Sequence, residues 1–181
     1  MPTKLYQREI KGFFMIARWI AQNEGFDNPN QDFSYVSDFV LMWSYAENKI
    51  VNRFGDNGDS LGCKAFDRYM KEFAVSSNEY VDKAYRFYAQ RYSGEDGARY
   101  FDGLFQMGHE RRFEEETIHI IENINADETA RVKAVAFICS RIRNNLFHGA
   151  KDLPMIAAQE DVLRNATVGM KGLAIAFHVA Q

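Results

Sequence analysis

The sequence predicts an all-α protein. Its apolar residues recur at spacings of three and four along most of the 181-residue chain, which is the period of an α-helix. The three prolines, at positions 2, 29 and 154, leave long stretches in which helices can form without interruption. Hydrophobic residues make up 46% of the chain, which is enough to fill the core of a single domain spanning 1–181. No segment alternates strongly enough to favour a strand over a helix.

The first half of the chain divides into four expected helices. The stretches 25–30, 55–58 and 93–97 carry the glycine, asparagine and proline residues that end helices. Ser76 and Glu79 have the Ser-x-x-Glu spacing of a capping box, which predicts the start of the fourth helix. The expected helices are about 3–22, 35–54, 60–73 and 77–91.

The second half carries a less regular stretch and then two long helical patterns. The stretch 98–124 is interrupted by two glycines, so it predicts either two short helices or a loop and one helix. Asp127 or Glu128 lies near the positive end of the helix that follows, and Gly149 ends that helix. A short connection holding Pro154 comes next. The expected helices of this half, beyond 98–124, are about 127–148 and 156–178.

The helix expected over 127–148 ends in a group of polar side chains. Its apolar residues fall four, three and four apart and predict one buried stripe. The polar residues fall at i, i+3, i+4 and i+7 on the other side of the helix. Exposing such a polar face to water costs little free energy, whereas burying it without hydrogen-bond partners would cost several kcal/mol. The buried stripe is Val135, Cys139, Ile142 and Leu146, and the polar face is Arg141, Asn144, Asn145 and His148. Arg141 and Asn145 are therefore supporting candidates for a site on this face.

Arg143, Asn144 and His148 form the string Arg-Asn-x-x-x-His. This string resembles the Arg-x4–6-His motif of HEPN domains, the higher eukaryote and prokaryote nucleotide-binding family. The longer string RIRNNLFHGAK, at 141–151, resembles a branch of the family in which the motif ends in His-Gly. HEPN domains are bundles of four or five helices with the motif near the start of the last helix pair. The resemblance implies such a bundle with additional helices, and a homodimer with the site between protomers.

The resemblance further implies a metal-independent endoribonuclease in which Arg143 and His148 are catalytic. RNA cleavage by its own 2′-hydroxyl needs a proton acceptor, a proton donor and a cation beside the phosphate. Histidine titrates near neutral pH, and arginine can hold two phosphate oxygens. Asn144 lies four residues before His148, so the two can hydrogen-bond or bracket one ligand. Arg143 and His148 are roughly 140° apart around a regular helix, and a two-fold dimer would pool the groups of two motifs.

Glu47 lies in the string Trp-Ser-Tyr-Ala-Glu, which is similar to an acidic position on an early HEPN helix. A carboxylate there would orient Arg143 or raise the basicity of His148. The alternative is an ordinary surface acid that pairs with Lys49 or Arg53.

The family context implies particular partners. Some HEPN enzymes are toxins of toxin–antitoxin and anti-phage defence systems, so the resemblance implies an RNA substrate and an antitoxin protein as a partner. The alternative interpretation is a non-catalytic HEPN-like module that binds a nucleotide, RNA or a protein, and a third is a helical scaffold with an incidental motif. The net charge of −3 and the pI near 5.8 favour these alternatives, because general nucleic-acid-binding surfaces are basic. The charge is nevertheless sorted along the chain, since between 129 and 151 there are five cations and no carboxylate.

The sequence predicts no cofactor and no metal site. His119 and Glu115 are spaced i, i+4, but one such pair on a helix is usually exposed, and His109 and His178 complete no ligand set. No glycine-rich phosphate loop follows a strand, which excludes Walker-type and Rossmann nucleotide sites.

The two cysteines and the hydropathy pattern predict a cytoplasmic protein without a membrane segment. Cys63 and Cys139 have no metal-type spacing, and Cys139 falls on the apolar stripe, so both are expected as reduced thiols. No apolar run approaches the length that spans a bilayer, and the start of the chain does not resemble a signal peptide.

Overall fold

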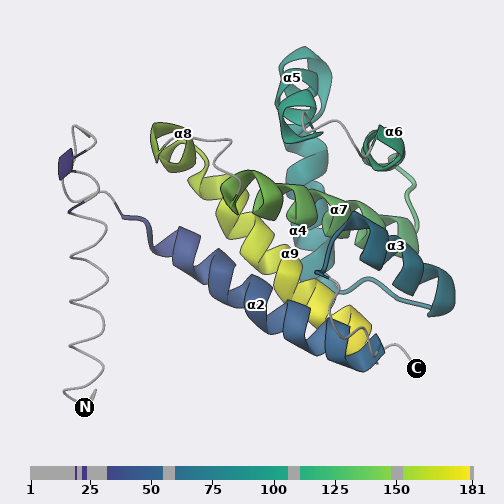
Figure 1. Cartoon of the computed structure of the whole chain (residues 1–181). Coiled ribbons are helices and arrows are strands. Elements are labelled where there is room, and N and C mark those ends of the chain that lie inside the picture. The colour runs from purple at the N-terminus through teal and green to yellow at the C-terminus, as the bar shows by residue number, and fades with distance from the viewer. Residues whose placement is uncertain are drawn as a thin grey trace.

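A computed structural model gives the structure of residues 19, 22–23, 32–54, 60–105, 111–147 and 153–179. The helix expected over 3–22 lies outside these residues, except for Trp19 and Gln22, which are helical. Every regular element in the described part of the chain is an α-helix, which confirms the predicted all-α class (Figure 1). The helices are α2 (Ser34–Phe54), α3 (Cys63–Glu72), α4 (Glu79–Arg91), α5 (Gly94–Phe105), α6 (Arg111–Glu122), α7 (Glu128–Phe147), α8 (Leu153–Ala157) and α9 (Glu160–Val179).

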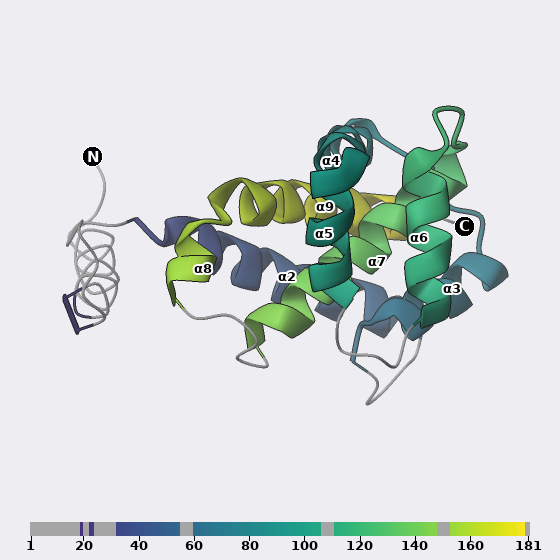
Figure 2. The same ribbon diagram turned by 90° about the horizontal axis from the view of Figure 1, so that it is seen from above.

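Helix α7, which carries the motif, lies at the centre of the bundle (Figures 1 and 2). It contacts α3, α4, α5, α6 and α9. Helix α2 lies alongside α9 and makes its main packing contact there, and α4 packs against both α7 and α9. One hydrophobic cluster runs through all the long helices, so each of them helps to fix the position of α7.

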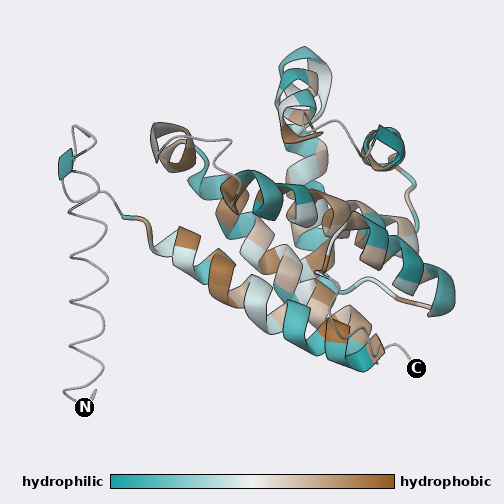
Figure 3. Cartoon of the chain, in the orientation of Figure 1, coloured by the Kyte–Doolittle hydropathy of each residue, from teal (hydrophilic) through white to brown (hydrophobic). Residues whose placement is uncertain are grey.

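The inner side of α2 is the one that the sequence predicts. Phe39, Trp43, Ala46 and Ile50 are buried. Figure 3 shows apolar residues on both α2 and α9, the two helices that pack together. On α9, Phe177 is fully buried and lies among aromatic rings from α2 and α3, with its ring centroid 5.5 Å from that of Phe66, 6.1 Å from that of Phe54 and 6.5 Å from that of Tyr69.

Helix α9 approaches its neighbours closely because of two glycines. A Cβ atom on Gly172 would lie 2.7 Å from the Val81 backbone nitrogen, and one on Gly169 would lie 2.9 Å from Val135 Cγ1. The Asn78 side chain donates to the Gly172 carbonyl (2.9 Å) while accepting from the first backbone N–H groups of α4. The N-terminus of α4 is therefore attached directly to the middle of α9.

Two predicted boundaries need correction. Asn78, rather than Ser76, caps α4, since its side chain accepts from the backbone nitrogens of Tyr80 (3.1 Å) and Val81 (3.2 Å). The break expected over 93–97 is much shorter, because Gly94 takes a positive φ of 75° and α5 begins there.

The less regular stretch forms two helices, α5 and α6, which is one of the two predicted outcomes. Pro154 lies in a short helix, α8, rather than in an irregular connection, and α9 starts at Glu160. The motif helix agrees closely with its predicted bounds, and Asp127 caps it by accepting from the Ala130 backbone nitrogen at 2.8 Å.

The face of α7 predicted to lie in water is partly buried. Arg141 and Asn145 are only 5% and 4% exposed, because α5 packs over this side of the helix. Leu146, expected in the buried stripe, is half-buried, whereas Val135, Cys139 and Ile142 are buried as predicted. The prediction failed because it assumed a helix with one packed face, and α7 is packed on nearly all sides.

A charge cluster joins α3, α6 and α7. The Asp67 carboxylate is 5% exposed and accepts from Lys71 (2.8 Å), Arg112 (2.6 Å) and Lys133 (3.2 Å). Burial raises the pKa of Asp67, but hydrogen bonds from Lys71 and Lys133 and their positive charges outweigh it, so the pKa is lower than usual.

Both cysteines are free thiols, as predicted, and both are buried, which the sequence predicted for Cys139 only. Burial raises the pKa of the Cys139 thiol to about 12, so this thiol is neutral and unreactive at physiological pH. None of the helices in the described part of the chain is both long enough and apolar enough to cross a membrane.

Candidate functional site

The last two turns of α7 divide the predicted site residues between two sides of the helix. Arg141 and Asn145 face α5, whereas Arg143 and Asn144 lie near α2 and the start of α3. His148 lies outside the described residues.

On the α5 side, two side chains converge on one backbone carbonyl. Arg141 Nε donates to the Leu104 oxygen at 3.3 Å, and Asn145 Nδ2 donates to the same oxygen at 3.0 Å. The Arg141 guanidinium also lies over the Phe105 ring, 5.6 Å from its centroid. Leu104 and Phe105 form the C-terminal turn of α5, where helix carbonyls lack partners within their own helix. Arg141 and Asn145 therefore fasten α5 to α7, so their contacts are structural.

On the other side, the Arg143 guanidinium is held by aromatic rings. Its Cζ atom lies 5.8 Å from the Trp43 ring centroid and 5.3 Å from that of Phe147. Arg143 Nη1 donates to the Asn144 side-chain oxygen at 3.2 Å, while Arg143 Nε is buried without a hydrogen-bond partner. No carboxylate of the described residues pairs with this guanidinium. Cation–π contacts contribute roughly 0.5–2 kcal/mol each, which offsets part of the cost of the unpaired nitrogen but leaves the positive charge without a carboxylate partner among the described residues.

Glu47 is the nearest predicted acidic residue, but its two oxygens have other partners. Oε1 accepts from the Leu61 backbone nitrogen at 2.8 Å, and Oε2 accepts from Trp43 Nε1 at 3.3 Å. Glu47 is thus not the surface acid paired with Lys49 or Arg53, and it makes no ion pair with Arg143. It holds the Trp43 indole, whose ring lies beside Arg143, and anchors the segment that leads into α3.

Beside Asn144 lies a cavity of about 420 Å³ at the N-terminus of α3. The N-cap residue, Gly62, has no side chain to cap the helix, and the first turn of α3 contains no acidic residue. Helix N-termini attract anions through their free N–H groups and the helix dipole. Lys64 and Arg68 line the same cavity and add two positive charges. This wall of the site is therefore positively charged.

Several local features of this site are missing from the sequence-based prediction. The acceptor shared by Arg141 and Asn145 is a backbone carbonyl of a helix about 40 residues away, which no side-chain pattern reveals. Lys64 and Arg68 lie outside the basic stretch 129–151. The only sequence signal for an anion site here is that Gly62 provides no capping side chain and that no acidic residue follows in the first turn of α3.

The remaining histidines do not form a cluster in the described part of the chain. His119 is exposed, Glu115 pairs with Arg111 at 3.0 Å, and Glu116 pairs with Lys133. His178 is exposed, and His109 lies outside the described residues. No group of three or more histidine, cysteine, aspartate or glutamate side chains within the described ranges is arranged to hold a metal ion.

Comparison of the chain with protein-family models, curated proteins and solved structures gives no match. The resemblance to HEPN domains therefore stays a prediction from the sequence motif.

Proposed function

We propose that this protein is a metal-independent endoribonuclease of the HEPN type. The observation that carries the proposal is the state of Arg143. Its guanidinium is held by Trp43 and Phe147 and has no carboxylate partner among the described residues, and the positive wall formed by Lys64 and Arg68 lies beside its neighbour Asn144. A guanidinium kept unneutralised next to such a wall is suited to bind an RNA phosphate.

The proposed reaction uses the RNA's own 2′-hydroxyl as the nucleophile. The 2′-oxygen forms a bond to the adjacent phosphorus while the bond from phosphorus to the 5′-oxygen breaks, leaving a 2′,3′-cyclic phosphate and a 5′-hydroxyl. In the proposed dimer, the His148 imidazole of one motif accepts the proton of the 2′-hydroxyl and the protonated His148 of the other donates a proton to the leaving 5′-oxygen. Arg143 stabilises the negative charge that develops on the phosphate. Asn144 orients Arg143 through the hydrogen bond between their side chains. Glu47 acts indirectly, by holding Trp43 in place.

A homodimer is part of the proposal. Phe147, beside Arg143, is 53% exposed, and Leu41 and Tyr45 on the outer side of α2 are 68% and 55% exposed. Where exposed apolar side chains form one continuous patch, the patch often marks a protein interface. A two-fold interface that includes Phe147 would bring two motifs together and supply both sets of catalytic groups to one RNA.

The biological setting follows from the family resemblance. We propose a cytoplasmic toxin of a toxin–antitoxin or anti-phage defence system, neutralised by an antitoxin protein that covers the motif. The alternative function is a non-catalytic module that binds RNA, a nucleotide or a protein through the same surface. The acidic pI of about 5.8 favours this alternative. The chain as a whole is acidic, so its positive charge is limited to a small area, whereas nucleic-acid-binding domains usually carry a broad basic surface.

The test is cleavage of a mixed RNA pool by the purified protein in EDTA, with Arg143→Ala, His148→Ala and Arg86→Ala compared at equal concentration. Arg86 is an exposed arginine of α4 for which the structure gives no pairing, so it serves as the matched control. Cleavage that survives chelation, stops in the first two variants and persists in the third supports the enzyme. RNA binding without cleavage, lost in Arg143→Ala, supports the alternative module.

A further inference from the structure

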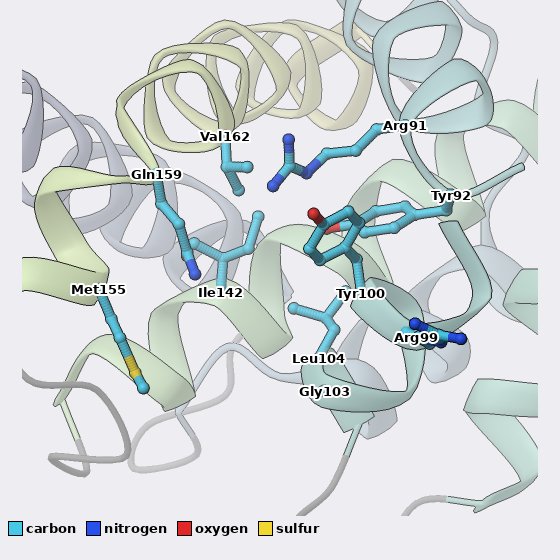
Figure 4. Close-up of a pocket in the computed structure, with 10 residues that line it drawn as sticks. All are labelled: Arg91, Tyr92, Arg99, Tyr100, Gly103, Leu104, Ile142, Met155, Gln159 and Val162. Atoms are coloured by element: carbon cyan, nitrogen blue, oxygen red, sulfur yellow. The ribbon is translucent and has the colours of Figure 1, made fainter. Parts of the chain in front are cut away.

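A second cavity, of about 270 Å³, lies between the end of α4, helix α5 and the start of α9 (Figure 4). Leu104, Ile142 and Val162 form its apolar wall. Its polar side chains include Arg91 and Tyr100. Ile142 comes from α7, but the two cavities share none of their described lining residues, so they are separate.

Arg91 brings a positive charge into this cavity without a matching carboxylate. Its Cζ atom lies 5.1 Å from the Tyr100 ring centroid, and its Nε is buried without a hydrogen-bond partner. No carboxylate within the described ranges forms an ion pair with it. The other arginine, Arg99, is exposed at the rim and lies 3.9 Å from Asp96, a surface pair that contributes little.

Two tyrosine hydroxyls lie near this guanidinium. Figure 4 shows Arg91, Tyr92 and Tyr100 turning their polar ends toward the middle of the cavity. Burial raises the pKa of Tyr92 to about 12, against the lowering effect of the adjacent Arg91, so its hydroxyl is protonated at neutral pH and can donate a hydrogen bond. One guanidinium and two hydroxyl donors thus point into the cavity, from the C-terminal end of α4 and from α5.

We propose that this cavity binds a small phosphate monoester, with the phosphate at Arg91, Tyr92 and Tyr100 and the organic group against Leu104 and Ile142. Donors that approach from different directions suit the three terminal oxygens of a phosphate better than the two coplanar oxygens of a carboxylate. The apolar wall suits the ester group. The volume lies just below the usual range for ligand pockets, which fits a small metabolite rather than a polymer.

The proposal goes beyond ribonuclease activity and does not depend on it, because none of the described residues assigned to RNA cleavage, Glu47, Arg143 and Asn144, lines this cavity. It is therefore tested by direct binding.

The experiment is isothermal titration calorimetry of the full chain with phenyl phosphate, inorganic phosphate and benzoate, at constant ionic strength. We expect phenyl phosphate to bind more tightly than the other two. Arg91→Ala should weaken phenyl phosphate binding about 10- to 100-fold, because it removes a charge-assisted contact. Arg86→Ala, on the same helix but with an exposed side chain, should bind like the parent.

Tyr100→Phe provides a second variant. Tyr100 is 59% exposed, so the change keeps the ring under Arg91, preserves the fold and removes only the hydroxyl. We expect a loss of about 2- to 10-fold in affinity, the effect of one neutral hydrogen bond. If Arg91→Ala does not fold, the phenyl phosphate affinities of Arg91→Gln and Tyr100→Phe are compared with that of the parent instead.

Three results would overturn the proposal. The first is that the parent does not bind phenyl phosphate at millimolar concentration. The second is that both the folded Arg91 variant and Tyr100→Phe bind phenyl phosphate as tightly as the parent. The third is that benzoate binds to the parent as tightly as phenyl phosphate does. RNA binding that depends on Arg91, without binding of the small ester, would assign the cavity to a polymer and would also overturn it.

Discussion

Arg141 and Arg143 stand two residues apart on one helix, yet their surroundings differ. Arg141 is 5% exposed and donates to the Leu104 carbonyl, together with Asn145. Arg143 is half-buried against two aromatic rings, and none of the described carboxylates pairs with it. A guanidinium bound to a backbone carbonyl of a packed helix stabilises the fold. A guanidinium lying on rings keeps its charge available for an anion.

The largest expected effect lies on the Arg143 side. Arg143→Ala and His148→Ala should each lower the rate of RNA cleavage by about 10²- to 10⁴-fold, since each removes a group needed in the transition state. The melting temperature of Arg143→Ala should fall by only a few degrees, because the side chain makes no hydrogen bond to another helix of the described structure and loses only its contacts with the Trp43 and Phe147 rings. Single-turnover cleavage and thermal melting measure the two effects. Parent-like cleavage by His148→Ala would remove the enzyme proposal.

Arg141→Ala should show the opposite behaviour. Loss of a buried, charge-assisted hydrogen bond to Leu104 should lower the free energy of unfolding by about 2–3 kcal/mol. The folded fraction should retain near-parental cleavage, because Arg141 faces α5. Urea denaturation followed by circular dichroism gives the stability. A large loss of activity at unchanged stability would place Arg141 in the site and abolish the distinction between the two arginines.

The stability of the packing of α3 against α6 and α7 should depend on pH through Asp67. The pKa of Asp67 is lowered in the folded state, so its contribution to stability is present above the unfolded-state value near 3.8 and is lost as the pH falls through the lower folded value. Asp67→Asn should destabilise the protein by about 1–3 kcal/mol at pH 7. The difference from the parent should shrink below about pH 4, as urea unfolding at a series of pH values would measure. A constant difference down to pH 2 would contradict this assignment.

The smallest effects should separate the two asparagines. Asn145→Ala should cost about 1 kcal/mol of stability, because it removes a buried hydrogen bond to Leu104. Asn144→Ala should leave the free energy of unfolding nearly unchanged and lower cleavage less than Arg143→Ala, because Asn144 only orients the guanidinium. Measuring both properties in both variants tests the assignment. Equal loss of stability in the two variants would contradict it.

The sequence predicts the helices well wherever one face of the helix is buried. The rhythm of Phe39, Trp43, Ala46 and Ile50 identifies α2 and its inner side correctly, because a helix packed on one side leaves an amphipathic pattern. Helix α7 is surrounded by other helices, so its polar residues are not a guide to solvent exposure. Arg141 and Asn145 are polar and buried because α5 supplies a carbonyl acceptor, and a contact between distant segments cannot be deduced from spacing along the chain.

The hydrogen-bond partners of one candidate site residue also cannot be predicted from the sequence. The sequence indicates Glu47 as a candidate, but its partners, Trp43 and the Leu61 backbone, depend on how the segment before α3 folds back onto α2. Asn78 rather than Ser76 caps α4, because the Asn78 side chain accepts from the first backbone N–H groups of α4 and also donates to the Gly172 carbonyl of α9.

The pairing of α2 with α9 has a consequence for the order of synthesis and folding. These helices are separated by more than 100 residues, and each provides the other's main packing surface. While the ribosome is still making α9, the apolar side of α2 lacks its main partner, and such long-range contacts form slowly. Trp43 and Glu47 lie on α2, so docking of α9 also helps to fix the aromatic support of Arg143. Under the proposed ribonuclease function, a nascent chain that already contains the motif would stay inactive until α9 docks, which would protect the cell's RNA during translation.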